Sequence, residues 1–306
     1  MKKILILAGG YSNEKEISFQ TAKSVCKELS KDKKKKLKVI NPNGDLIKNI
    51  KKFKPDLVLN LLHGRYGEDG YIQSILENQK VKYTHSGVLS SSIAMDKEIS
   101  KKIFKDNNIL TPKYFIYSFK KKLNRKQIIL KIKNKLNFPV VIKPLNEGSS
   151  VNVFICGIKD VYKNINKLSH YSELMIEKYI PGREIQVAIL NNKILGAIEL
   201  KPKRKFYDYT AKYSSHAKTE HIIPVKLNVK NSKKVNNIAL KAHKILKCRG
   251  VTRSDFRFFN GKFYLLELNT QPGMTSLSLV PEIANYYGIN FKRLIEKIIN
   301  DASTNK

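Results

Sequence analysis

Short apolar runs alternate with a helix-like stretch at the start of the chain. The runs KILILAGG (3–10), LKVIN (37–41) and PDLVLNLLHG (55–64) are expected to form strands, and a helix is expected from about Ser18 to Leu29. Strands that alternate with helices are typical of an open parallel sheet, whose ligands gather at the carboxyl ends of its strands. The pattern therefore predicts an N-terminal α/β domain.

The rest of the chain mixes longer helices with strands. One helix is expected through AMDKEISKKIFKD (94–106), and strand-like runs follow at FPVVIK (138–143) and on both sides of Gly182. Beyond a polar region (201–221), helices are expected over 231–247 and near 291–300. At 306 residues the chain has room for two or three domains and a substantial core.

The segment FYLLELN (263–269) combines a core-like strand with a carboxylate and an amide. Glu267 and Asn269 are two residues apart, so on a strand they project from one face. A buried, unpaired charge is costly, and a metal ion is its natural partner. Both side chains offer the oxygen ligands that Mg²⁺ prefers. A half-exposed strand with two solvated polar side chains explains this segment equally well.

The formal net charge of +34 raises the question of a nucleic-acid partner. Only eight of the 59 basic residues are Arg, and the chain holds 35 Ile and 27 Asn, a composition that drift toward A/T-rich codons would produce. Aromatic residues are not interleaved with the lysine tracts, as a base-stacking surface would require. Nucleic-acid binding is therefore kept only as a minor alternative.

The remaining composition points to the cytoplasm. Apolar residues make up 42% of the chain, and no apolar run reaches the length of a membrane span. The first residues are followed closely by Glu14 and Glu16 without a cleavage pattern, so a signal peptide is not expected. Cys26, Cys156 and Cys248 lack metal-ligand spacing, which favours reduced, structural thiols.

Several motifs resemble the ATP-grasp enzymes, and most closely the D-alanine–D-alanine ligase family. In chain order they are GGYSNEKEIS, HGRYGEDG, AMDK, VIKPLNEGSS, EKYIPGRE, FYDYTAKY, RSDF and ELNTQPGMTSLSLVP. Each is a weak signal alone, since glycines after strands commonly serve only to turn the chain, but the ordered set is specific. The resemblance implies a three-domain α/β ATP-grasp fold: an open parallel-sheet domain (1–92), a central ATP-grasp domain (93–182) and a C-terminal domain (183–306).

The resemblance also implies a reaction. Members of the family use ATP to phosphorylate the carboxylate of one D-alanine, and the amine of a second D-alanine attacks the acyl phosphate to give a dipeptide for peptidoglycan synthesis. The segment from about Lys203 to His221 is expected to close over ATP and exclude water. The implied ATP-binding residues are Lys97, Lys143 and Lys212 at the phosphates, Glu177, Lys178 and Ile180 around adenine, and Glu184 at the ribose.

A metal and oxyanion site is implied in the C-terminal domain. Asp255, Glu267 and Asn269 resemble the family's ligands for two Mg²⁺ ions that bridge the ATP phosphates, with Mn²⁺ as an alternative ion. Arg253 and the backbone N–H of Gly273 are assigned to the oxyanion of the tetrahedral intermediate.

The resemblance places the amino-acid substrates near the remaining motifs. Glu14 pairs with the ammonium of the first D-alanine and is linked through Ser149 to Tyr213. His63 lies near the same substrate. The carboxylate of the second D-alanine is expected at Ser278 and the backbone of Leu279.

Three positions depart from the family pattern. Tyr66 and His85 stand where glycine is usual, and Thr210 stands where a charged residue is usual. None of the three is assigned to the chemistry. A cytoplasmic homodimer without a membrane or specific nucleic-acid partner is expected. The alternatives are a ligase with another acceptor, such as D-lactate, and a basic binding protein that keeps only the fold.

Overall fold

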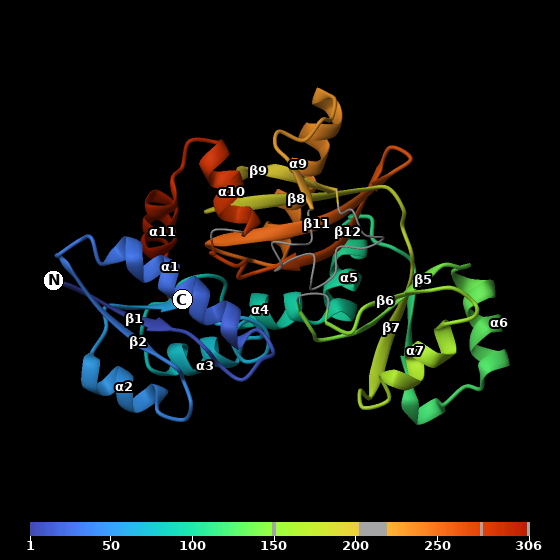
Figure 1. Ribbon diagram of the computed structural model, residues 1–306, viewed down its shortest axis with the longest axis horizontal. Coiled ribbons are helices and arrows are strands. Elements are labelled where there is room, and N and C mark those ends of the chain that lie inside the picture. Colours follow the sequence, from blue (N-terminus) through green and yellow to red (C-terminus); the bar gives the residue numbers. More distant parts are fainter. Residues whose placement is uncertain (149–150, 202–218, 276–277, 305–306) are drawn as a thin grey trace.

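The computed structural model describes residues 1–148, 151–201, 219–275 and 278–304. Within these ranges the strands form three sheets, which Figure 1 shows as blue, green and yellow-to-orange parts of the chain. Among the expected site residues, Ser149, Lys212 and Tyr213 lie outside the described residues, as do Thr210 and most of the segment expected to close over ATP.

The first sheet is parallel, with strand order β2-β1-β3, as the sequence predicted. Strands β1 and β3 are buried on both faces, whereas edge strand β2 is partly exposed. In β1, Ile4 and Ile6 belong to one core cluster, and Leu5 and Leu7 to another. The elements of this part are β1 (Lys2–Leu7), α1 (Lys15–Leu29), β2 (Lys35–Ile40), α2 (Leu46–Phe53), β3 (Leu57–Asn60) and α3 (Tyr71–Asn78).

The cluster around Ile4 and Ile6 is completed by the far end of the chain. Helix α11 (Phe291–Asn300) contributes Leu294 and Ile298, which share this cluster with apolar residues of α1. Figure 1 shows α11 beside α1. The backbone N–H and C=O groups of Ser303 exchange hydrogen bonds with those of Tyr83, at 3.1 and 3.2 Å. The C-terminal segment therefore packs on the N-terminal sheet.

The helix expected over residues 94–106 is in fact two helices, α4 (Val88–Met95) and α5 (Lys97–Asp106). Asp96 separates them with an extended backbone (φ −81°, ψ 106°), and its side chain accepts hydrogen bonds from the N–H groups of Glu98 and Ile99. An Asp in this geometry is a preferred N-cap. The break places Lys97 in the first turn of α5.

The second sheet is antiparallel, with order β4-β7-β5-β6. Helices α6 and α7 supply Ile128, Ile132, Val161 and Ile165 to the core cluster that the sheet shares with them. Its elements are β4 (Tyr114–Ser118), η1 (Phe119–Lys121), α6 (Arg125–Lys135), β5 (Val140–Pro144), β6 (Phe154–Cys156), α7 (Val161–Lys167) and β7 (Glu173–Lys178).

The third sheet is also antiparallel, with order β10-β9-β8-β11-β12. Helix α9 packs on the face that carries Phe256 and Leu265, and α10 packs toward the first sheet. Its elements are β8 (Arg183–Leu190), β9 (Lys193–Lys201), β10 (Glu220–Ile222), α9 (Val229–Ile245), β11 (Val251–Phe259), β12 (Lys262–Asn269) and α10 (Leu279–Tyr286).

Two further findings concern the helices and the cysteines. No helix within the described ranges is long and apolar enough to cross a membrane. Cys26, Cys156 and Cys248 are free thiols, and burial raises the pKa of each, that of Cys248 to about 12.

Candidate active site

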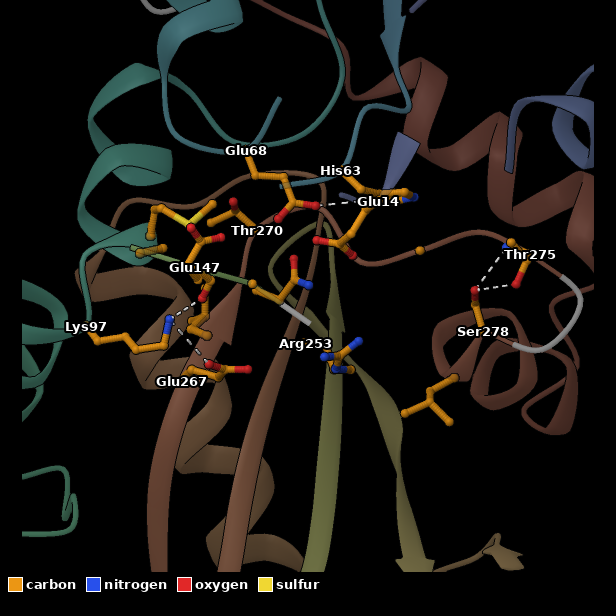
Figure 2. Close-up of a pocket in the computed structure, with 17 residues that line it drawn as sticks. Glu14, His63, Glu68, Lys97, Glu147, Arg253, Glu267, Thr270, Thr275 and Ser278 are labelled. Carbon is orange, nitrogen blue, oxygen red and sulfur yellow. Dashed lines mark hydrogen bonds and ion pairs between the residues drawn. The ribbon is translucent and has the colours of Figure 1, made fainter. Parts of the chain in front are cut away.

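Two adjoining cavities lie between the sheets. The first, of about 100 Å³, draws its lining from all three parts of the chain and is shown in Figure 2. The second, of about 80 Å³, lies between the second and third sheets. Lys97, Glu147 and Glu267 line both cavities, so a molecule in one would meet a molecule in the other at these side chains.

A β-bulge in β12 decides where the acidic strand residues point. Asp255 pairs with Glu267, but the next residue of β11, Phe256, pairs with Leu265, so Leu266 is the extra residue. Strict alternation would put Glu267 on the core face with Leu265. The bulge instead turns Glu267 toward the cavities, while Leu265 stays in the core.

The predicted metal ligands lie opposite one another on this face. Asp255 is in register with Glu267, and Arg253 with Asn269. The side chain of Arg253 donates to both carboxylate oxygens of Asp255, at 2.8 and 3.0 Å, and the Asn269 amide oxygen accepts from the N–H of Gln271 at 2.8 Å. Carboxylate oxygens keep further lone pairs when they accept a hydrogen bond, so this all-oxygen donor set fits Mg²⁺.

Within the described ranges, no group of three or more His, Cys, Asp or Glu side chains is placed to hold a metal ion. The predicted set contains only two such residues, because its third member is the amide of Asn269. The predicted metal-binding set is therefore defined by its motif and its position on the strands, and it does not form a cluster of acidic side chains.

Lys97 lies in the shared wall. Its ammonium donates to the backbone C=O of Glu147 and is 4.0 Å from a carboxylate oxygen of Glu267. Burial lowers the pKa of Lys97, which the charge of Glu267 partly opposes. A compact ammonium in this wall is suited to bind phosphate oxygens.

Lys143 is part of a buried ion-pair group. Its ammonium is 2.6 Å from one oxygen of Glu177, and the ammonium of Lys101 is 3.1 Å from the other. Burial by itself would raise the pKa of Glu177, but the two lysines hold it below its usual value. Lys143 and Glu177 line the second cavity, so this predicted pair is brought together where the sequence placed ATP.

The Tyr171 hydroxyl contacts two residues that follow β5 in the chain. The hydroxyl accepts from the Asn152 amide at 3.0 Å and donates to a carboxylate oxygen of Glu147 at 3.2 Å. Since Glu147 lines both cavities, Tyr171 fixes a residue of the shared wall.

The second cavity also contains the remaining predicted ATP residues that the structure describes. Lys178, Ile180 and Glu184 line it. The guanidinium of Arg257, a residue that the sequence reasoning missed, is 2.9 Å from the Glu184 carboxylate.

The first cavity is lined by described residues that the sequence assigned to the amino-acid substrates. Glu14 and His63 line it together with Glu68, which the sequence reasoning also missed. His63 Nδ1 is 3.2 Å from Glu68 Oε1, and His63 Nε2 is 3.2 Å from Thr21 Oγ1. Burial raises the pKa of Glu68, His63 opposes this rise and Glu14 adds to it. Figure 2 shows Glu14, His63 and Glu68 along one side of the cavity, with Arg253 across from them.

Gly273, Thr275, Ser278 and Leu279 also line this cavity. The Ser278 hydroxyl lies 2.9 Å from both the N–H and the hydroxyl of Thr275. A Cβ on Gly273 would come within 3.0 Å of Ser278 Oγ, so glycine allows the backbone to approach closely.

At two of the three positions that depart from the family pattern, the backbone adopts a conformation that favours glycine. Tyr66 and His85 both adopt φ 69°, in the left-handed region that favours glycine. His85 is buried, which lowers its pKa to about 3 and keeps its ring neutral. The chain thus keeps a conformation suited to glycine at both positions while carrying larger side chains.

A lysine-lined cavity between two antiparallel sheets, beside a parallel-sheet domain, is the arrangement of the ATP-grasp ligases. The family model described as D-ala D-ala ligase C-terminus matches residues 103–300. A D-alanine--D-alanine ligase of Pelagibacter ubique (strain HTCC1062) is 63% identical over 305 residues, covering 100% of this chain and 99% of that protein. The chain belongs to the D-alanine–D-alanine ligase family.

Solved structures agree with this assignment. The crystal structure of D-alanine--D-alanine ligase from Bacillus anthracis has a TM-score of 0.86 at 36% identity, and covers 98% of this chain and 97% of that chain. A second structure from that organism, complexed with ATP, has a TM-score of 0.84 at 34% identity with the same coverage. The predicted three-domain α/β ATP-grasp fold is confirmed.

Proposed function

We propose that this protein joins two molecules of D-alanine to D-alanyl-D-alanine and converts ATP to ADP and phosphate. The observation that carries the proposal is the pair of cavities with a shared wall. A nucleotide in the second cavity would bring its terminal phosphate to Lys97 and Glu267, and a carboxylate substrate in the first cavity would approach the same wall. Phosphoryl transfer between two anions requires this kind of positioning and charge neutralisation.

The nucleotide is assigned to the second cavity. Lys97 and Lys143 neutralise phosphate charge, and the Glu177–Ile180 segment lies along the adenine, with Glu184 accepting from the ribose hydroxyls. Lys212 is assigned to the γ-phosphate.

Asp255, Glu267 and Asn269 are the residues that would hold Mg²⁺, or Mn²⁺ in its place. Two such ions, when bound, supply positive charge to the phosphate oxygens as the phosphoryl group moves. Support comes from the direct register of Asp255 with Glu267, from Asn269 two pairs further along the same ladder, and from the bulge that turns Glu267 to the cavity.

The chemistry then has two steps. A carboxylate oxygen of the first D-alanine attacks the γ-phosphorus, which gives D-alanyl phosphate and releases ADP. The neutral amine of the second D-alanine attacks the carbonyl carbon, and the tetrahedral intermediate expels phosphate as the nitrogen loses a proton. Arg253 and the N–H of Gly273 stabilise the oxyanion, because fixed donors act strongly in a dry site.

The two substrates are assigned to the first cavity. Glu14, with Ser149 and Tyr213, binds the ammonium of the first D-alanine, and His63 lies beside it. Ser278 and the backbone of Leu279 bind the carboxylate of the second. The assignment is supported by Glu14, His63, Ser278 and Leu279 all lining this one cavity.

The cellular setting is part of the proposal. We place the protein in the cytoplasm as a homodimer that supplies a peptidoglycan precursor, a setting that suits three free thiols. We also propose domain boundaries near residues 92 and 182. The division of the strands into sheets supports the second, because β7 ends at Lys178 and β8 begins at Arg183.

The test is a product assay on the purified protein. Phosphate release and product identity are measured with ATP and Mg²⁺ in the presence of D-alanine, L-alanine, D-lactate, or D-alanine with D-lactate. Phosphate release that depends on D-alanine, with D-alanyl-D-alanine as the main product near neutral pH, is expected. Predominant depsipeptide in the mixture would assign D-lactate as acceptor, and ATP binding without turnover would leave only the binding-protein alternative.

A further inference from the structure

Arg257 is a buried cation in the wall of the second cavity. It lies on β11 directly opposite Glu184 on β8, and its Nη2 is 2.9 Å from Glu184 Oε2. Both side chains are 9% exposed. The pair is therefore largely removed from solvent, where a charge requires a close partner of opposite sign.

A second contact of Arg257 reaches the connection between the second and third sheets. Its Nη1 donates to the backbone C=O of Gly182 at 3.1 Å. Gly182 adopts φ +102° and sits directly against the backbone of Phe258, so the chain has no room for a side chain at this turn. One guanidinium thus fixes both the start of β8 and the carboxylate of its second residue.

We propose that Arg257 is a positioning residue for the ribose of the nucleotide, acting through Glu184. A guanidinium is planar and presents its donors in a rigid fork, so at 2.9 Å across the β8–β11 register it restricts the orientation of the Glu184 carboxylate. An oriented carboxylate accepts from ribose hydroxyls without first paying the entropy of ordering its own side chain. This inference rests on the proposed role of Glu184 in nucleotide binding.

Arg257 also differs in role from the other cations of the site. Arg253, Asp255 and Arg257 alternate along β11 and so share the face toward the cavities. Arg253 and Asp255 pair with each other, whereas Arg257 pairs across to β8. Arg257 therefore contacts the residue assigned to the ribose of the nucleotide. Its replacement should weaken nucleotide binding more than it slows the chemical step.

Arg183 offers a matched control. It lies next to Glu184 on β8 and makes a two-point contact with Glu199, at 2.7 and 2.6 Å, but it does not line the second cavity. Arg183→Met also removes an arginine–glutamate contact that involves β8, although the Arg183 side chain is 34% exposed whereas that of Arg257 is 9% exposed. A general loss of sheet stability would appear in both variants, and a loss of ribose recognition only in Arg257→Met.

The experiment measures the Kd of ATP and of 2′,3′-dideoxy-ATP by calorimetry with Mg²⁺ and without D-alanine, and then steady-state kinetics. Arg257→Met should weaken ATP binding by about 10- to 100-fold and remove most of the preference for ATP over the dideoxy nucleotide. Its kcat at saturating ATP should change by less than about threefold. Arg257→Lys should recover part of the preference, and Arg183→Met should keep wild-type binding.

A double-mutant cycle with Glu184→Gln tests whether Arg257 acts through that residue. In the Glu184→Gln background, Arg257→Met should not change the ratio of the two Kd values further.

The proposal is overturned if Arg257→Met keeps the wild-type preference, if it weakens both nucleotides equally, or if its effect is the same with Glu184 absent. If Arg257→Met does not fold, a wild-type preference in Arg257→Lys overturns the proposal and a reduced one supports it. Wild-type protein that binds ATP with this ribose preference but makes no dipeptide would refute the proposed ligase activity and leave the role of Arg257 standing.

Discussion

Replacing Lys101 with Met should stabilise the folded protein at neutral pH. Lys101 is 1% exposed on α5, and its ammonium shares the carboxylate of Glu177 with Lys143. Methionine has a similar length and no charge, so Lys101→Met removes the desolvation of an ammonium and leaves the Lys143–Glu177 pair in place.

The expected size of the effect follows from the pKa of Lys101. Burial, partly opposed by Glu177, lowers this pKa from 10.5 to about 8. Since one pKa unit corresponds to about 1.4 kcal/mol, the charge on Lys101 costs the folded state roughly 3 kcal/mol at neutral pH. Glu177 loses one of its two counter-charges in the variant, which offsets part of the gain. We expect a net stabilisation of about 1–3 kcal/mol.

The stability difference between Lys101→Met and wild type should also change with pH in a defined direction. The pKa of Lys101 is lower in the folded than in the unfolded state, so between about pH 8 and pH 10.5 the unfolded chain binds more protons. Wild-type stability therefore gains a contribution as pH rises through this window, and Lys101→Met lacks it. The advantage of the variant should shrink from about pH 7 to about pH 10.

Urea unfolding of both proteins at these pH values is the assay. Lys102→Met is the matched control, because Lys102 is the next residue of α5, 62% exposed and paired with Glu98 across one turn. Its stability should stay within about 0.5 kcal/mol of wild type. A Lys101→Met protein that is less stable than wild type near pH 7, or an advantage that does not shrink at high pH, would refute the reasoning.

Three further predictions concern the site. Glu267→Gln should lower turnover by about 100-fold or more, with partial rescue at high Mg²⁺ and little change in melting temperature, and normal turnover at ordinary Mg²⁺ would exclude it as a metal ligand. Gly182→Ala should cost roughly 1–3 kcal/mol in urea unfolding, because its φ is +102° and Phe258 occupies the space. Tyr171→Phe should raise the KM for ATP roughly three- to tenfold with a smaller effect on kcat, and an unchanged KM would contradict its role in fixing the shared wall.

The parallel sheet was predictable because β1 and β3 are buried on both faces and read as continuous apolar runs. The terminal helix was likewise placed at its observed bounds. The break at Asp96 was missed, because the residues on both sides of it favour a helix and only the cap geometry separates them.

The site residues that belong to a sequence motif were predictable. The contacts that depend on pairing between strands were not. Glu267 and Asn269 were expected to share a face, which the structure confirms, but the bulge at Leu266 that turns this face to the cavities has no signature in the alternation of residues. Arg257 and Glu184 are far apart in sequence, and their contact exists only once β8 and β11 are aligned. The roles assigned to the site residues remain predictions for the experiments above.

The return of α11 to the first sheet has a consequence for protein synthesis. A ribosome delivers β1, α1 and β3 first, but the residues that cover Ile4 and Ile6 include Leu294 and Ile298, which emerge after all three sheets have been made. The bridge between Tyr83 and Ser303 forms later still. The domain that is translated first is therefore completed last, and until then part of the apolar face of its nascent sheet is covered only by α1 and is left open to chaperones.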